Sequence, residues 1–168
     1  MNSWAGMAAE NSIKTQLATE SLQMTGVLRL KVNGWSMLPT IWPGDTVVIR
    51  AVDYNNIVTG EIAFFRRGDD FYIHRVLKKK LSSREILSRG DAMPHSDPPF
   101  ASGELLGKIE LILRQGSAIE PCRRLSPAQR LAAGVMQRSE SAARFAVTVR
   151  QLCRDLHPSY RVDSLCQP

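Results

Sequence analysis

Two short β-type segments, separated by a loop with glycine and proline, constrain the fold of this chain more than any other feature. Residues 28–32 alternate between apolar and basic side chains, which is the period of a half-buried strand, and residues 46–52 form a second apolar run. The loop between them carries Ser36. Glycine tolerates conformations that other residues avoid and proline fixes its own φ, so we expect this serine to sit on a rigid loop between two strands.

This placement suits a nucleophile. A serine hydroxyl is weak until a base and an oxyanion site meet it in fixed geometry, and a rigid loop supplies that geometry. Gly34 precedes Ser36 by two residues and Pro39 follows it by three. We therefore treat Ser36 as a candidate catalytic residue, against the alternative of a surface turn that happens to contain serine and proline.

The same loop resembles the nucleophile box of the signal peptidase I superfamily, which includes LexA-type repressors. That box reads G-x-S-M-x-P-T and continues, after a short gap, with G-D-x-V. The matching residues here are Gly34, Ser36, Met37, Pro39, Thr40, Gly44, Asp45 and Val47. The resemblance implies a mainly β catalytic domain in which Ser36 is the nucleophile and Gly34, Met37 and Pro39 border the substrate.

A second point of resemblance is the tripeptide His74-Arg75-Val76, which lies in a strand expected at 71–79. Bacterial signal peptidases and LexA-type repressors use a lysine in this strand, whereas the archaeal and endoplasmic-reticulum branch has H-R-V. The resemblance to that branch implies that His74 is the general base. Imidazole suits the role at neutral pH because its unperturbed pKa is about 6.5.

A third box, roughly G-D-N-N-x-x-x-D in the family, resembles the loop from Gly90 to Asp97. Asp97 takes the place of the last aspartate and is our first choice for the acid of a Ser-His-Asp triad. Asp91 is the second choice, with a role in holding the loop. Ala92 and Met93 stand where the family has asparagines, which leaves the loop geometry open. His95 is an alternative base but lacks the strand context.

The other elements follow from periodicity and turn residues. We expect a short helix within 9–24, ended by Gly26, and further strands at 61–66, 85–88 and 104–114. From Ser126 onward the period changes to 3.6, which predicts one or two helices with an apolar stripe of Leu131, Val135, Ala142, Phe145, Val149, Leu152 and Leu156. The expected organisation is an N-terminal extension at 1–26, a β catalytic domain at 27–120 and a C-terminal amphipathic helical extension at 121–168.

The face opposite this stripe is rich in arginine, so two interpretations stay open. The helix packs its stripe on the β domain, which we favour, or its basic face binds an anionic membrane or a membrane partner. The formal charge of +6 fits an acidic partner without requiring one. Three cysteines, at 122, 153 and 166, have no metal-binding spacing, and neither a metal nor an organic cofactor is implied. Their odd number favours a reducing compartment.

No apolar run of about 18 residues is present, and the N-terminus lacks the basic start and apolar centre of a secretory signal. We therefore expect a cytoplasmic protein, with peripheral membrane attachment left open. The expected function is a serine endopeptidase that cleaves a protein or peptide precursor after small residues. The alternatives are a catalytically idle relative that binds nucleic acid or membrane, and a LexA-type self-cleaving regulator. The LexA-type regulator needs a DNA-binding unit before the peptidase domain, and 26 leading residues are too few for one. Nucleic acid is not expected as a partner.

Overall fold

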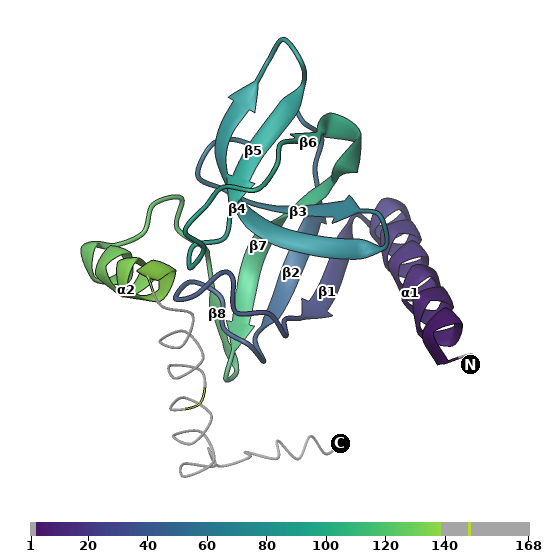
Figure 1. Ribbon diagram of the computed structural model, residues 1–168, viewed down its shortest axis with the longest axis horizontal. Coiled ribbons are helices and arrows are strands. Elements are labelled where there is room, and N and C mark those ends of the chain that lie inside the picture. Colours follow the sequence, from purple (N-terminus) through teal and green to yellow (C-terminus); the bar gives the residue numbers. More distant parts are fainter. Residues whose placement is uncertain (1–2, 139–147, 149–168) are drawn as a thin grey trace, which may run out of the picture.

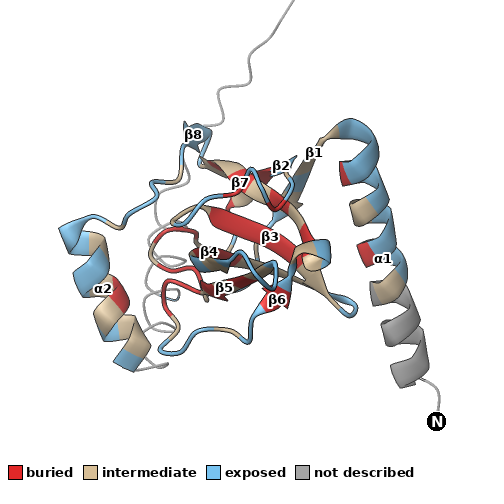
Figure 2. Ribbon diagram, turned by 90° about the horizontal axis from the view of Figure 1, so that it is seen from above, coloured by how far each residue is buried: buried red, intermediate tan, exposed pale blue. Residues whose placement is uncertain are grey.

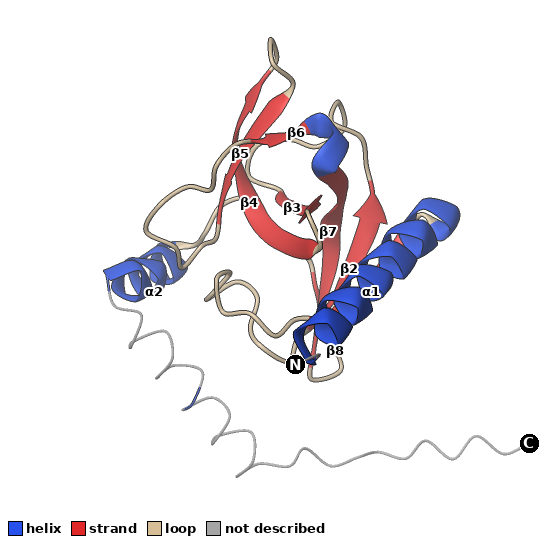
Figure 3. Cartoon of the chain, turned by 45° about the vertical axis from the view of Figure 1, so that its right-hand side comes forward, coloured by secondary structure: helices blue, strands red, loops and turns tan. Residues whose placement is uncertain are grey.

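The computed structural model of the chain describes residues 3–138 and residue 148, and its side chains from residue 12 onward. It is mainly β, as expected: one antiparallel sheet of eight strands in the order β1-β2-β7-β3-β4-β5-β6, with β8 paired to β7 (Figures 1 and 3). The elements are α1 (Ser3–Thr25), β1 (Val27–Lys31), β2 (Thr46–Ala51), β3 (Ile62–Arg67), β4 (Asp70–Lys80), β5 (Glu85–Arg89), β6 (Phe100–Ala101), β7 (Leu105–Arg114), β8 (Ser117–Ile119) and α2 (Pro127–Arg138), with a 3₁₀ turn at Ser102–Glu104.

The six strands expected from periodicity are confirmed, each within one residue at either end. Two short strands, β6 and β8, were not predicted. Gln115 and Gly116 form the two-residue turn that joins β7 to β8, and both have positive φ angles. The glycine just after the strand expected at 104–114 is the signal for this turn in the sequence. β6 has only two residues, too few for an alternating pattern to show.

The central strands β3 and β4 separate two hydrophobic cores. Ile62 and Phe64 on one face of β3 belong to the first core, whereas Ala63 and Phe65 on the other face belong to the second. This burial on both faces explains why β3 reads as a continuous apolar run, and it appears in red at the centre of the molecule in Figure 2. β4 pairs with β3 and divides its side chains in the same way, as its alternation predicted.

Helix α1 is longer than the expected segment at 9–24. The extension covers residues 3–8, which include two alanines, and alanine has the highest helix propensity. The helix lies against one side of the sheet, at the opposite side of the molecule from α2 (Figure 2). Leu22 is buried in the first core, and the Thr15 hydroxyl donates a hydrogen bond to the carbonyl of Asp69 at 2.9 Å. These contacts join α1 to the β4 side of the sheet.

Helix α2 begins at the expected serine and proline, but the expectation for its apolar stripe was wrong at two described positions. Leu131 and Val135 are 74% and 55% exposed, so they do not pack on the β domain. Ala133 is buried instead, and Met136 packs beside the nucleophile loop. The reason is the rotation of the helix, because a small alanine allows closer approach than leucine or valine would.

The rest of the expected stripe lies outside the described residues: Ala142, Phe145, Val149, Leu152 and Leu156. Among the helices within 3–138, none combines the length and the apolar character needed to cross a bilayer.

Candidate active site

Ser36 lies in the loop between β1 and β2, as expected. Backbone hydrogen bonds from Thr40 and Ile41 to the Met37 carbonyl, at 2.9 and 3.0 Å, fold the loop into a single turn after the serine. The side chains of Met37 and Ile41 are buried in the first core and anchor this turn. The expectation for Gly34 was wrong in one respect: its φ angle is not positive, and a Cβ there would meet open space. The rigidity of the loop therefore comes from its buried side chains.

His74 of β4 faces Ser36 across this loop. The Nε2 atom of His74 lies 3.0 Å from the Ser36 Oγ atom, within hydrogen-bond distance. The His74 side chain is 9% exposed, and its imidazole makes edge-on contacts with the Phe65 and Tyr72 rings, at centroid distances of 6.3 and 6.1 Å. Packing against two aromatic rings limits the orientations that the imidazole can adopt.

Asp97 lies on the other side of the imidazole. Its Oδ2 atom is 2.7 Å from His74 Nδ1, and the Ser88 hydroxyl donates a hydrogen bond to the same oxygen at 2.6 Å. The Asp97 backbone N–H donates to the Ser88 carbonyl at 2.9 Å, so two bonds hold the loop to β5. Ser36, His74 and Asp97 thus form a continuous hydrogen-bonded chain.

The pKa of Asp97 determines which imidazole nitrogen carries the proton. Burial alone would raise the pKa of this carboxyl, but hydrogen bonds from His74 and Ser88, with the charges of His74 and Arg67, bring it below its ordinary value. An ionised carboxylate can only accept, so the Nδ1 atom of His74 must be the donor. In the neutral imidazole Nε2 is then unprotonated and accepts the Ser36 hydroxyl proton.

Asp91 has different partners. Arg75, the neighbour of His74 in β4, binds its two carboxylate oxygens through Nε and a terminal nitrogen, each at 2.7 Å. The Thr40 hydroxyl also donates to Asp91. The side chains of Arg75 and Asp91 are 9% and 4% exposed, so this is a buried, bidentate ion pair. It links the nucleophile loop to β4 and to the loop that carries Asp97.

Gly90 allows the two loops to approach closely. A Cβ at this position would lie 2.5 Å from the Ser36 carbonyl oxygen, which no side chain could tolerate without movement. The Ala92 N–H donates to that same carbonyl at 2.9 Å, so the backbone of the nucleophile is held directly by the acid-bearing loop. Ala92 stands where the family has an asparagine, but this contact does not depend on the side chain, because the backbone N–H makes it.

A cleft of about 330 Å³ opens beside Ser36 and His74. Gly34 and Met37, both expected near a substrate, line it, whereas the Pro39 carbonyl accepts a hydrogen bond from the Trp42 indole at 2.8 Å. His95, the alternative base, is exposed on the surface. The wall of the cleft is largely apolar and includes Ile41, Phe64, Phe71, Tyr72 and Ile73.

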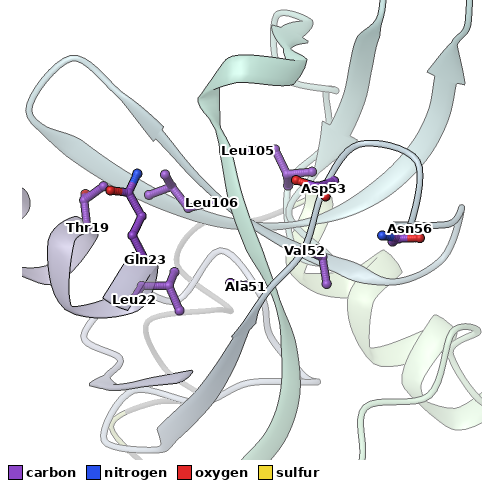
Figure 4. Close-up of a pocket in the computed structure, with 9 residues that line it drawn as sticks. All are labelled: Thr19, Leu22, Gln23, Ala51, Val52, Asp53, Asn56, Leu105 and Leu106. Atoms are coloured by element: carbon purple, nitrogen blue, oxygen red, sulfur yellow. The ribbon is translucent and has the colours of Figure 1, made fainter. Parts of the chain in front are cut away.

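A second cavity, of about 420 Å³, lies between α1 and the ends of β2 and β7 (Figure 4). It shares no lining residue with the cleft, and its polar side chains, Thr19, Gln23, Asp53 and Asn56, include no base beside a hydroxyl. The Ser36 site is therefore the better candidate for catalysis. Within the described residues, no group of three or more His, Cys, Asp or Glu side chains could hold a metal ion.

Four contributors to the site were not singled out as functional from the sequence. Ser88 has no local signal, because its role depends on the pairing of β5 with β4. Thr40 and Arg75 belong to the recognised boxes, but their common partner, Asp91, becomes visible only in three dimensions. Gln137 of α2, which donates to the Asp91 carbonyl at 3.0 Å, lies far from every box.

Comparison with known proteins identifies a family for most of the chain. A family model described as Peptidase S24-like matches residues 3–109, which include Ser36, His74, Asp91 and Asp97. No curated protein matches the chain.

Proposed function

Because the chain belongs to the Peptidase S24-like family, we propose that it is an active serine endopeptidase with Ser36 as nucleophile, His74 as general base and Asp97 as the acid of the triad. The observation that carries this proposal is the hydrogen-bonded chain from Ser36 Oγ to His74 Nε2 and from His74 Nδ1 to Asp97 Oδ2, at 3.0 and 2.7 Å. A base within hydrogen-bond reach of the hydroxyl, itself oriented by a third group, is the arrangement that activates a serine.

The chemistry proposed follows from these positions. Ser36 Oγ attacks the scissile carbonyl while His74 Nε2 takes its proton, and the imidazolium then gives that proton to the leaving amine. Water, deprotonated by the same nitrogen, hydrolyses the acyl-enzyme and restores the serine hydroxyl. Asp97 remains ionised and stabilises the imidazolium. The Ser36 backbone N–H is the proposed donor to the oxyanion of the tetrahedral intermediate.

The proposed substrate is an extended segment of a protein or peptide precursor, bound with the residues before the scissile bond along the cleft. The apolar lining supports uncharged side chains there, and the preference for small residues is carried over from the resemblance. The use of histidine instead of lysine supports a relationship to the archaeal and endoplasmic-reticulum branch of signal peptidases. The branch and the substrate are parts of the proposal.

We propose one further partner, an anionic membrane surface in contact with α2. The exposed side chains Leu131 and Val135 accompany three exposed arginines at 124, 130 and 138. An apolar stripe flanked by positive charge complements anionic headgroups above an acyl layer.

The test of the peptidase is mass-spectrometric analysis of a diverse peptide library incubated with the wild-type protein, Ser36→Ala, His74→Ala and His95→Ala. We expect cuts by the wild type and by His95→Ala, and a loss of about 10⁴-fold or more in kcat/KM for the other two variants. Circular dichroism and thermal unfolding establish that each variant is folded. The residues before the cut define the specificity.

Two results would contradict the proposal. A folded wild-type protein that makes no Ser36-dependent cut in peptides, in denatured proteins or in its own chain would favour an idle binding module. Equal losses in His95→Ala and His74→Ala would remove the distinction between the two histidines.

A further inference from the structure

The segment 121–138, which lies beyond the part of the chain matched by the family model, contacts the residues that hold the proposed triad in place. We infer that this segment is a positioning element of the active site: it completes the binding of Arg75 and Asp91 and thereby sets the geometry between Ser36 and His74. This inference rests on the proposed function.

The first contact is to Arg75. Its guanidinium binds Asp91 on one side, and on the other its Nη1 atom donates to the carbonyls of Gly60 and Cys122, at 2.7 and 2.9 Å. A buried guanidinium needs partners for its donors, since each unsatisfied group carries a desolvation penalty. The Cys122 carbonyl is therefore part of the site that fixes Arg75, one residue from His74.

The second contact holds this carbonyl against the sheet. Gly60 has a φ of +92°, and a Cβ there would lie 2.7 Å from the Arg123 carbonyl oxygen, so the absence of a side chain lets segment 121–138 approach the turn before β3. Arg123 also forms an ion pair with Glu61 at 3.3 Å. The Glu61 side chain is otherwise held by Lys108 at 2.8 Å, which gives the segment a fixed anchor on β7.

The third contact is made by α2 itself. The Gln137 side chain donates to the Asp91 carbonyl at 3.0 Å, and Met136 packs in the cluster formed by Leu38, Ala92 and two tryptophans. Leu38 belongs to the nucleophile loop and Ala92 to the acid-bearing loop. The helix therefore covers the junction of the two loops, where the Ala92 N–H binds the Ser36 carbonyl.

These contacts reach the triad from two directions. Through Asp91 and Ala92 they hold the backbone of Ser36, and through Arg75 they hold the strand position next to His74. None of the residues that line the cleft comes from segment 121–138. A disturbance of this segment is therefore expected to change kcat, by altering the distance between nucleophile and base, and to leave KM almost unchanged.

The experiment compares three variants of the full chain. Gln137→Glu keeps the size of the side chain but removes the donor to Asp91, and Gln137→Ala removes the side chain. Ala128→Ser is the matched control, because this residue is exposed on the same helix and belongs neither to the triad nor to the proposed membrane surface. We expect kcat to fall about tenfold in both Gln137 variants with KM changed less than about twofold, and to stay at the wild-type value in the control.

A second measurement does not depend on turnover. In ¹⁵N-histidine-labelled protein, the Nδ1–H proton of His74 is expected to give a downfield signal, and both Gln137 variants should shift it while Ala128→Ser does not. If the Gln137 variants match the control in kcat and in this signal, the inference is wrong. If the wild type makes no Ser36-dependent cut, the proposed function is wrong, and the imidazole signal alone decides whether Gln137 sets the geometry at His74.

Discussion

At the scale of single residues, two carboxylates of one loop have surroundings that suit different roles. Asp97 contacts the imidazole of His74 and the hydroxyl of Ser88, whereas Asp91 is enclosed by Arg75 and Thr40. The first arrangement stabilises a developing positive charge on the imidazole. The second neutralises a permanent charge and ties two loops together.

Substitution should separate these roles. We expect Asp97→Asn to lower kcat by about 10³-fold to 10⁴-fold, because the imidazole loses the acceptor that fixes its tautomer, and to destabilise the fold less than Asp91→Asn does. Asp91→Asn should lower the free energy of unfolding by about 3 kcal/mol, since it leaves a buried guanidinium without its counter-charge. Peptide cleavage and urea unfolding measure the two effects. Asp70→Asn, at an exposed position, is the control, and a larger rate loss in Asp91→Asn would move the acid to Asp91.

The lowered pKa of Asp97 makes its contribution to stability depend on pH. A carboxyl with a lower pKa in the folded protein stabilises the fold above the ordinary value of 3.8, and this stabilisation disappears as the pH falls through the folded value. The difference in free energy of unfolding between wild type and Asp97→Asn should therefore be largest near neutral pH and shrink below about pH 4. Urea titrations at several pH values test this. A difference that grows on acidification would contradict the assignment.

At the scale of elements, α1 presents apolar side chains to both the sheet and solvent. Leu22 is 1% exposed and belongs to the first core, whereas Leu17 on the outer face is 59% exposed. The first core also holds Met37 and Ile41 of the nucleophile loop. The helix thus shares a core with the proposed active site.

Because Leu22 belongs to this shared core and Leu17 does not, replacing each by alanine should destabilise the fold by unequal amounts. Leu22→Ala should lower the free energy of unfolding by about 3 kcal/mol, because it opens a cavity in a packed core. Leu17→Ala, the matched control, should change it by less than about 0.5 kcal/mol. Chemical unfolding followed by circular dichroism gives both values. Equal effects would mean that α1 does not stabilise the core.

At the scale of the whole molecule, positive charge accompanies one exposed apolar face. The formal charge is +6, and Leu131 and Val135 of α2 are exposed. Helix α2 lies on the opposite side of the molecule from α1 (Figure 2). We expect binding to phosphatidylglycerol vesicles that weakens as salt is added, and little binding to neutral phosphatidylcholine vesicles.

Flotation assays provide the measurement. Leu131→Ser combined with Val135→Ser should lower the bound fraction several-fold, whereas Leu17→Ser, at an equally exposed site on α1, should not. If the bound fraction falls equally in the α2 and α1 variants, or if the protein binds neutral and anionic vesicles equally well, α2 is not the lipid-binding face.

The sequence by itself determined the features that repeat along the chain. Alternating and continuous apolar runs, bounded by turn residues, predicted six strands to within one residue, and their mainly β organisation is confirmed. The three boxes also placed Ser36, His74 and Asp97 in a loop, a strand and a second loop, as observed. Periodicity and turn residues reflect burial and backbone conformation, which are local and can be read without knowing what packs against what.

Tertiary structure alone decided which side chains meet. It brings Asp97 to the imidazole and Asp91 to Arg75, recruits Ser88 from β5, and turns α2 so that Gln137 faces the acid-bearing loop while Leu131 faces solvent. These contacts join loops and strands far apart in the sequence. The distances between these side chains depend on the curvature of the sheet and on the packing of the loops. The periodicity of the sequence predicts neither.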